Sequence, residues 1–194
     1  MRLYHYAPKK NTILKQGLYS FSKSTGNLKS YAFFAKTTKK KDIIAWMDKV
    51  FPGCSRSISC FTEPVKWRGN DKFLKKTVKN TVLFSFELND LIKAGLVESI
   101  WCRDDLSHKG RKYVLDDGYE QYFYKVKPEK IDTSPIPWDK AKKNNRTGQL
   151  RHYMIVLKNG VIPPKYLRLE KSDFGGWLYN LSLFIKRLFA HKKR

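Results

Sequence analysis

Three residues that lie far apart in the sequence, His5, Tyr31 and Glu120, have the chemistry to act together on a dinucleotide. Cleavage of a nicotinamide–ribose bond develops positive charge on the ribose ring, and a carboxylate beside the 2′-hydroxyl stabilises that charge. A tyrosine face suits the cationic nicotinamide ring through stacking and cation–π attraction. A neutral imidazole can exchange hydrogen bonds with ribose hydroxyls. The three residue types therefore fit cleavage of a glycosidic bond in NAD.

Each of the three residues also has an ordinary structural interpretation. His5 can be a half-buried histidine on an alternating strand, and Tyr31 is one of 11 tyrosines that can fill a core. Glu120 can point outward as a solvated cross-strand partner of a lysine. The residue types alone leave both interpretations open.

The composition favours a folded, strongly basic body. The 194 residues suit one domain with or without an appendage, and 41% hydrophobic residues suffice for a packed core. Lysine and arginine number 40 against 17 acidic residues, which gives a net charge of +23. This excess predicts a polyanionic partner: DNA, RNA, an acidic protein or an anionic membrane face. A lysine-rich surface that serves only solubility is the alternative.

The cysteines and the apolar runs of the sequence indicate the cellular compartment of the protein. The three cysteines, Cys54, Cys60 and Cys102, are an odd number without metal-ligand spacing, so we expect free thiols and no metal. The start "MRLYHYAPKK" lacks the apolar run of a signal peptide. We therefore expect a cytoplasmic protein, in the cell that makes it or in a host cell that receives it.

The elements that must position the chemistry are mostly strands. Aromatic and β-branched runs predict strands at 2–7, 30–35, 57–62, 81–87, 97–101, 111–115, 119–126 and 150–157. Helices are expected from Asn11 to Gly17, from a Thr37 or Thr38 cap to Pro52-Gly53, and from an Asn89 cap. Strands and helices do not alternate regularly, which predicts an α+β fold. The proline-containing stretch 134–149 should be a loop.

Residues 171–194 form a separate predicted unit after a domain at 1–170. The stretch 172–190 predicts a basic amphipathic helix whose apolar face carries Trp177, Leu181, Phe184, Ile185 and Leu188. That face can dock on the sheet, or residues 172–194 can lie on an anionic membrane surface.

The pattern "LYHY…N…IL..GL", followed by "YAFFA" running into a helix ending in Trp46, resembles the amino-terminal half of ADP-ribosyltransferase-fold proteins. The resemblance covers about residues 2–131 and is closest to the class with a His, a Tyr and a Glu, which includes toxin-like enzymes and the DNA-modifying DarT group. It implies a split β-sheet core and NAD as the substrate.

The resemblance also implies roles for individual residues. Its catalytic Glu falls on Glu120, its nicotinamide platform on Tyr31 and its ribose anchor on His5 with Tyr6. Ser59 and Phe61 would line the same cofactor site, and Phe61 with Glu63 would lie near its mouth.

This sequence departs from the family's pattern at several positions. Gly118 stands where many toxin members have a Glu or Gln two residues before the catalytic Glu. Arg2 and Ser57-Ile58-Ser59 imitate a second subclass, so the subclass stays open. A related RNA 2′-phosphotransferase-like activity would need basic residues for a phosphate, for which Arg56, Arg103 and Arg111 are candidates.

A basic segment after the third predicted strand is a candidate nucleic-acid contact. It mixes cations with one tryptophan, a combination that suits single strands or a flipped base. Its members are Lys66, Trp67, Arg68, Lys72, Lys75, Lys76 and Lys79. A solvated basic helix is the alternative.

The sequence therefore predicts an NAD-dependent mono-ADP-ribosyltransferase of toxin or effector type. Its acceptor would be a nucleic acid or a nucleic-acid-associated protein. The alternative is a non-enzymatic nucleic-acid-binding protein on a degenerate ADP-ribosyltransferase fold.

Overall fold

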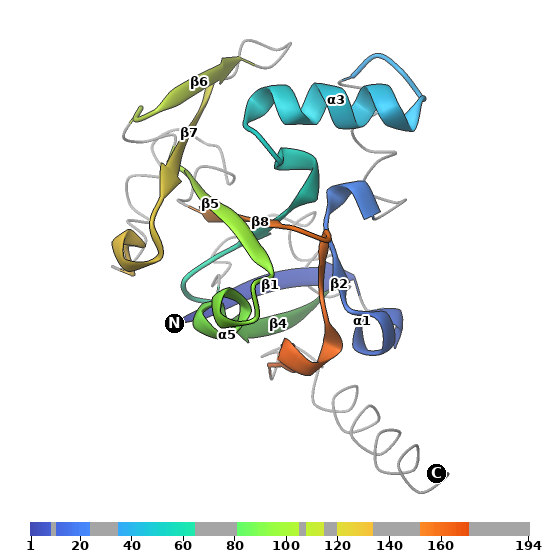
Figure 1. The fold of residues 1–194 in the computed structure, drawn as a ribbon, viewed down its shortest axis with the longest axis vertical. Coiled ribbons are helices and arrows are strands. Elements are labelled where there is room, and N and C mark those ends of the chain that lie inside the picture. The colour runs from blue at the N-terminus through green and yellow to red at the C-terminus, as the bar shows by residue number, and fades with distance from the viewer. Residues whose placement is uncertain are drawn as a thin grey trace, which may run out of the picture.

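The fold is known from a computed structural model of the chain (Figure 1). The structure describes residues 1–8, 11–23, 35–64, 81–104, 108–114, 120–133 and 152–170. Several predicted elements lie outside these ranges: the strand at 30–35 except its last residue, the basic segment 66–79, the loop at 134–149 and the helix within 171–194.

The described helices match the predicted ones in place but not in their capping residues. They are α1 (Asn11–Gln16), α3 (Lys40–Val50) and α5 (Leu88–Lys93). The N-cap of α3 is Lys39, so the predicted threonine cap is wrong; the Thr37 hydroxyl instead accepts the Lys39 N–H and lies 3.4 Å from the Asp42 carboxylate. Helix α5 starts at Leu88 after Glu87, so Asn89 lies inside the helix and does not cap it.

Five antiparallel strands form the larger sheet, in the order β3, β8, β5, β7, β6. Their bounds are β3 Ser57–Cys60, β8 His152–Leu157, β5 Val97–Arg103, β7 Glu120–Val126 and β6 Arg111–Val114. All five coincide with predicted strands to within a few residues. Strand pairing across the sheet is far from sequence order, because β8 comes from the carboxy-terminal part of the chain yet lies between β3 and β5.

A second, three-stranded sheet has the order β1, β4, β10. Its strands are β1 Arg2–Pro8, β4 Thr81–Glu87 and β10 Arg168–Leu169, and a separate pair joins β2 (Leu18–Tyr19) to β9 (Val161–Ile162). The described residues also form short 3-10 helices: η1 Phe21–Lys23, η2 Cys54–Arg56, η3 Pro128–Lys130 and η4 Pro164–Tyr166. The two-residue strands β2, β9 and β10 were not predicted, because two residues carry no periodicity that could reveal them.

Apolar side chains of the two sheets face one another and form the main core. Buried residues on β1 and β4, such as Leu3 and Phe84, belong to one cluster with Ile58, Ile100 and Ile155 of the larger sheet. Burial of this apolar surface is the principal stabilising term for such a packing.

A second core lies on the other face of the larger sheet, beneath α3. The buried side of α3, including Ile43 and Met47, packs with Phe51, Phe123 and Val156. Figure 1 shows α3 on the far side of the larger sheet from β1 and β4. Antiparallel sheets with segregated helices confirm the predicted α+β class.

The cysteines of the described chain are free thiols in apolar surroundings. Cys54, Cys60 and Cys102 are all buried and unpaired by disulfides. Burial raises the pKa of the Cys54 thiol to about 12, so it stays protonated at neutral pH. Within the described residues no helix combines the length and apolar character needed to cross a bilayer.

Candidate functional site

The two sheets meet at a seam between β1 and β3. The Tyr4 N–H donates to the Phe61 carbonyl and the Phe61 N–H to the Tyr4 carbonyl, each over 2.9 Å. This antiparallel bridge is the one backbone pairing that joins the sheets within the described ranges. At this seam a side chain of β1 reaches the backbone of β3.

His5 spans this seam. Its Nδ1 lies 2.6 Å from the carbonyl oxygen of Ser59 on β3. A carbonyl oxygen only accepts hydrogen bonds, so Nδ1 carries the proton and donates. Burial lowers the pKa of His5 below its ordinary value, and the hydrogen bond to Ser59 opposes this only in part. At neutral pH the ring is therefore neutral, with an acceptor lone pair on Nε2.

The surroundings of His5 are apolar. Leu3, His5 and Ala7 share one face of β1, and Leu3 and Ala7 are core residues. The residue directly opposite His5 on β4 is the buried Phe84. His5 itself is partly exposed. Its ring makes no second hydrogen bond with any residue that the structure describes.

The structure brings some of the predicted cofactor residues together at the seam and separates others. His5, Ser59 and Phe61 meet there, although Ser59 takes part through its backbone carbonyl. Tyr6 is the next residue after His5, so its side chain points to the opposite face of β1. His5 and Tyr6 are thus not brought to one face, contrary to their predicted joint role as a ribose anchor.

Glu120 lies at the other end of the larger sheet, where it begins β7 opposite Val114 of β6. Its carboxylate forms an ion pair with Lys112 and accepts a 2.6 Å hydrogen bond from the Tyr122 hydroxyl. The Lys112 contact is the main reason that the pKa of Glu120 is lowered. The Glu120 side chain is 40% exposed, so it is a solvated cross-strand partner of a lysine.

The structure does not bring Glu120 to His5. Two strands, β8 and β5, separate β7 from β3, whose Ser59 holds the His5 ring. Three strand spacings correspond to about 14 Å. Glu120 also lies beyond the last residue of β7 that pairs with β5, which is Phe123. The predicted convergence of these two residues on one ribose is therefore not found in this arrangement.

The remaining predicted site residues lie outside the described chain. These are Tyr31 and the nucleic-acid set Lys66, Trp67, Arg68, Lys72, Lys75, Lys76 and Lys79. Their predicted roles stay predictions.

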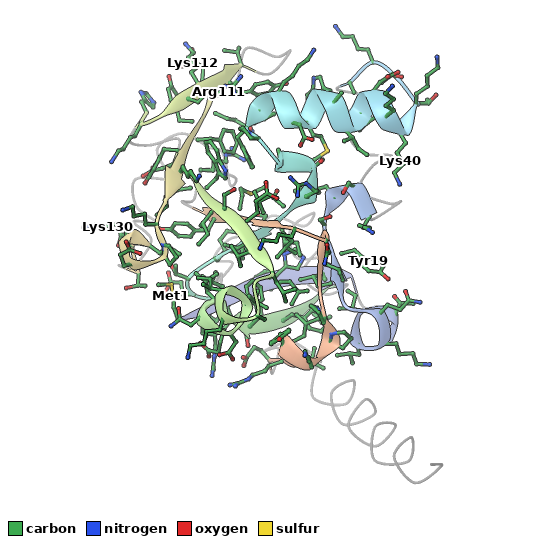
Figure 2. All side chains as sticks on the ribbon, viewed as in Figure 1. Met1, Tyr19, Lys40, Arg111, Lys112 and Lys130 are labelled. Atoms are coloured by element: carbon green, nitrogen blue, oxygen red, sulfur yellow. The ribbon has the colours of Figure 1, made fainter. Side chains whose placement is uncertain are left out.

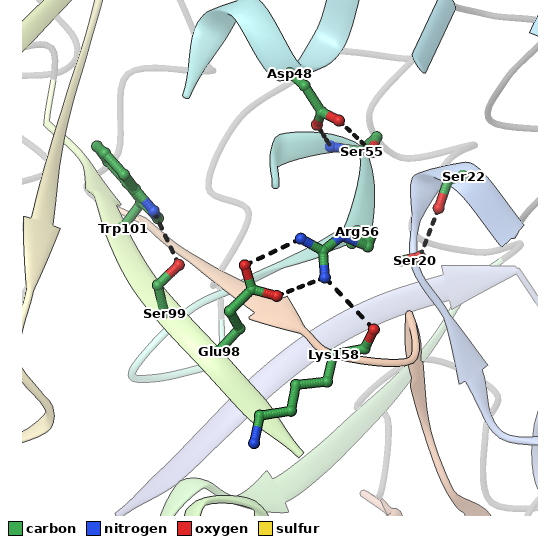
Figure 3. A network of polar contacts seen from close by, with 9 residues as sticks. All are labelled: Ser20, Ser22, Asp48, Ser55, Arg56, Glu98, Ser99, Trp101 and Lys158. Atoms are coloured by element: carbon green, nitrogen blue, oxygen red, sulfur yellow. Dashed lines mark hydrogen bonds and ion pairs between the residues drawn. The ribbon is translucent and has the colours of Figure 1, made fainter. Parts of the chain in front are cut away.

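The three candidate phosphate-binding arginines divide into two groups. Arg56 is engaged by Glu98, with contacts of 2.5 and 3.0 Å, and lies 3.4 Å from the Lys158 carbonyl (Figure 3). Arg103 and Arg111 instead both lie opposite Phe123, one from each side of β7. The sequence did not predict that these two arginines lie in one row, because no local pattern encodes the register between strands.

Comparisons with known proteins do not assign the chain to a family. No family model matches it, no curated protein matches its sequence, and no solved structure matches its fold.

Proposed function

We propose that this protein has an ADP-ribosyltransferase-like split-sheet core and binds NAD at the seam between its sheets, to transfer ADP-ribose to a nucleic acid or a nucleic-acid-associated protein. The observation that carries the proposal is His5. Its imidazole donates from Nδ1 to Ser59 and, being neutral, offers Nε2 as an acceptor. A ribose hydroxyl is a donor that matches this atom.

Further support comes from the chain's arrangement around His5. The resemblance placed the ribose-binding histidine on the first strand of a split sheet, and β1 is the strand at which the two sheets diverge. The net charge of +23 is suited to a polyanionic acceptor.

The catalytic carboxylate is the part of the proposal that the geometry supports least. Glu120 is exposed, held by Lys112 and distant from His5 along the sheet. Glu63 is a second carboxylate to test, because it follows the seam residue Phe61 by two positions. A transferase of this kind needs one carboxylate beside the ribose to stabilise its cationic transition state.

The test is transfer of label from NAD in the presence of single-stranded DNA, RNA and protein acceptors. The proposal expects label on one acceptor with wild-type protein and loss of transfer in either Glu120→Gln or Glu63→Gln. If the Glu120 variant retains full transfer, Glu120 is a structural residue. If no acceptor is labelled and NAD does not bind, the proposal is wrong.

A non-enzymatic nucleic-acid binder is the second candidate, and the position of Glu120 favours it. On that hypothesis the fold retains a basic surface without an assembled catalytic set. It predicts steeply salt-dependent binding to nucleic acid with no NAD turnover at any pH.

A further inference from the structure

We propose that Arg103, Arg111 and Lys125, on the α3 side of strands β5, β6 and β7, bind the phosphodiester backbone of a single-stranded nucleic acid. This surface, the arginine row, consists of other residues than the basic segment 66–79 that the sequence suggested. The proposal deepens the proposed function by naming where its nucleic-acid partner lies.

Strand register places the three cations together. Arg103 on β5 and Arg111 on β6 both oppose Phe123 of β7, so the two arginine side chains lie on the same face of the sheet as Phe123. Lys125 is two residues beyond Phe123 and therefore lies on the same face, opposite Trp101. Two strand spacings and two residues along a strand give a patch of about 10 by 7 Å.

The charged residues at the described positions of β5, β6 and β7 on this face are all basic. The remaining positions of β5, β7 and β6 that share it are Ser99, Trp101, Gln121, Phe123 and Tyr113, none of which is acidic. The Glu98 carboxylate interacts electrostatically with Lys125 and is held by a bidentate contact with Arg56 (Figure 3). Arg111 and Lys125 are exposed, so their charges face solvent.

Arginine and aromatic groups on this face match the chemistry of a single strand. A planar guanidinium can donate two parallel hydrogen bonds to one phosphate. Tyr113 packs edge-on against Trp46 of α3, with ring centroids 6.0 Å apart, and both rings are partly exposed. Unpaired bases can stack on such rings, whereas the bases of a duplex are already stacked.

The opposite face of the same hairpin provides a matched control. Lys112 lies there, paired with Glu120, and Lys109 lies over the ring of Tyr124, 5.0 Å from its centroid. Figure 2 shows Arg111 and Lys112 as neighbours on β6, close to α3. Neighbouring residues of one strand point to opposite faces of the sheet. Arg111 and Lys112 therefore lie at the same end of β6, but their side chains are on opposite faces.

The experiment compares two double variants with equal loss of charge, Arg111→Gln with Lys125→Gln and Lys109→Gln with Lys112→Gln. Fluorescence anisotropy measures binding of labelled oligo(dT) across salt concentrations, and circular dichroism confirms that both variants fold. Loss of two phosphate contacts should reduce the slope of log K against log salt by about 1.4. A fourfold salt increase would then weaken wild-type binding about 7-fold more than binding by the first variant. The control variant should keep the wild-type slope.

A further variant, Arg103→Lys, keeps the charge but not the planar fork, and should bind a few-fold more weakly with an unchanged slope. Equal slope changes in both double variants, or none in the first, would overturn the proposal. It would also be overturned if the first variant lost binding to poly-glutamate or to duplex DNA but kept binding to oligo(dT). Labelled-NAD turnover without oligonucleotide is measured in parallel, because it tests the proposed function and should be equal in wild type, the first double variant and Arg103→Lys.

Discussion

Substitution of His5 by asparagine and by phenylalanine distinguishes the roles of its two ring nitrogen atoms. An asparagine amide can donate to the Ser59 carbonyl from close to the position of Nδ1, but it has no group at the position of Nε2. Phenylalanine removes both nitrogens and keeps a planar aromatic ring of slightly larger size. The asparagine variant therefore tests ligand binding, and the phenylalanine variant tests both binding and stability.

The magnitudes follow from the single hydrogen bond and the apolar setting of His5. Leaving the Ser59 carbonyl without its donor costs about 1–3 kcal/mol, which lowers the Tm of a chain of this size by about 2–12 °C. Asparagine keeps that bond and should stay within about 1 kcal/mol of wild type. Loss of one acceptor for a ribose hydroxyl costs about 0.5–1.5 kcal/mol, so both variants should bind NAD about 2- to 13-fold more weakly.

Thermal unfolding and titration calorimetry with NAD measure the two effects independently. The expected result is a lower Tm in the phenylalanine variant alone and weaker NAD binding in both. Wild-type NAD affinity in the asparagine variant would refute the role of Nε2. Equal destabilisation of the two variants would refute the assignment of Nδ1 as the donor to Ser59.

The pKa of His5 gives the sign of a pH effect. Because the pKa is lowered in the folded state, the unfolded chain takes up a proton first as the pH falls. The contribution of His5 to stability is therefore complete above its unfolded pKa of about 6.5 and is lost as the pH falls through the folded value. The His5→Asn variant should lack this part of the pH dependence of Tm, and an unchanged profile would contradict the sign.

Substitutions at three other positions test the packing of the sheets and one ion pair. Gly110→Ala should lower stability by about 1–3 kcal/mol in denaturant unfolding, because Gly110 has a φ of 94° and an added Cβ would lie 2.3 Å from the Phe123 carbonyl oxygen. Ile155→Ala should cost about 2–5 kcal/mol, since Ile155 is fully buried between the sheets, whereas Ile155→Val should cost about 0.5–1.5 kcal/mol. Arg56 lowers the pKa of Glu98, so wild type should lose more stability than Glu98→Gln as the pH falls below about 4.5; parallel pH profiles of Tm would contradict this.

Local patterns predicted the described helices and the longer strands well. The helix predicted from Asn11 to Gly17 is α1, which ends at Gln16 directly before Gly17 with its φ of 98°. The buried residues of α3, Ile43, Met47 and Val50, follow the three- and four-residue spacing of one helix face. Capping was predicted less well, because backbone geometry and neighbouring residues decide which side chain reaches a helix terminus. At α3 the terminus is Lys39, which makes no side-chain cap.

The candidate site was predictable only in part. The histidine on the first strand could be singled out from its residue type and place, but its partner is a backbone carbonyl, which every residue possesses. Glu120 was singled out by a resemblance in its strand, yet the register of β6 with β7 places Lys112 and Tyr122 beside it. Sequence spacing carries no information on which strands become neighbours in a sheet.

The sequence by itself determined the charge of +23 and the order of the described helices and longer strands along the chain. These properties depend on residue type and on short-range periodicity. The tertiary structure alone decided that His5 meets Ser59, that Glu120 meets Lys112, and that Arg103 and Arg111 flank Phe123. Such juxtapositions arise from pairing between strands distant in sequence, which packing of the whole chain selects.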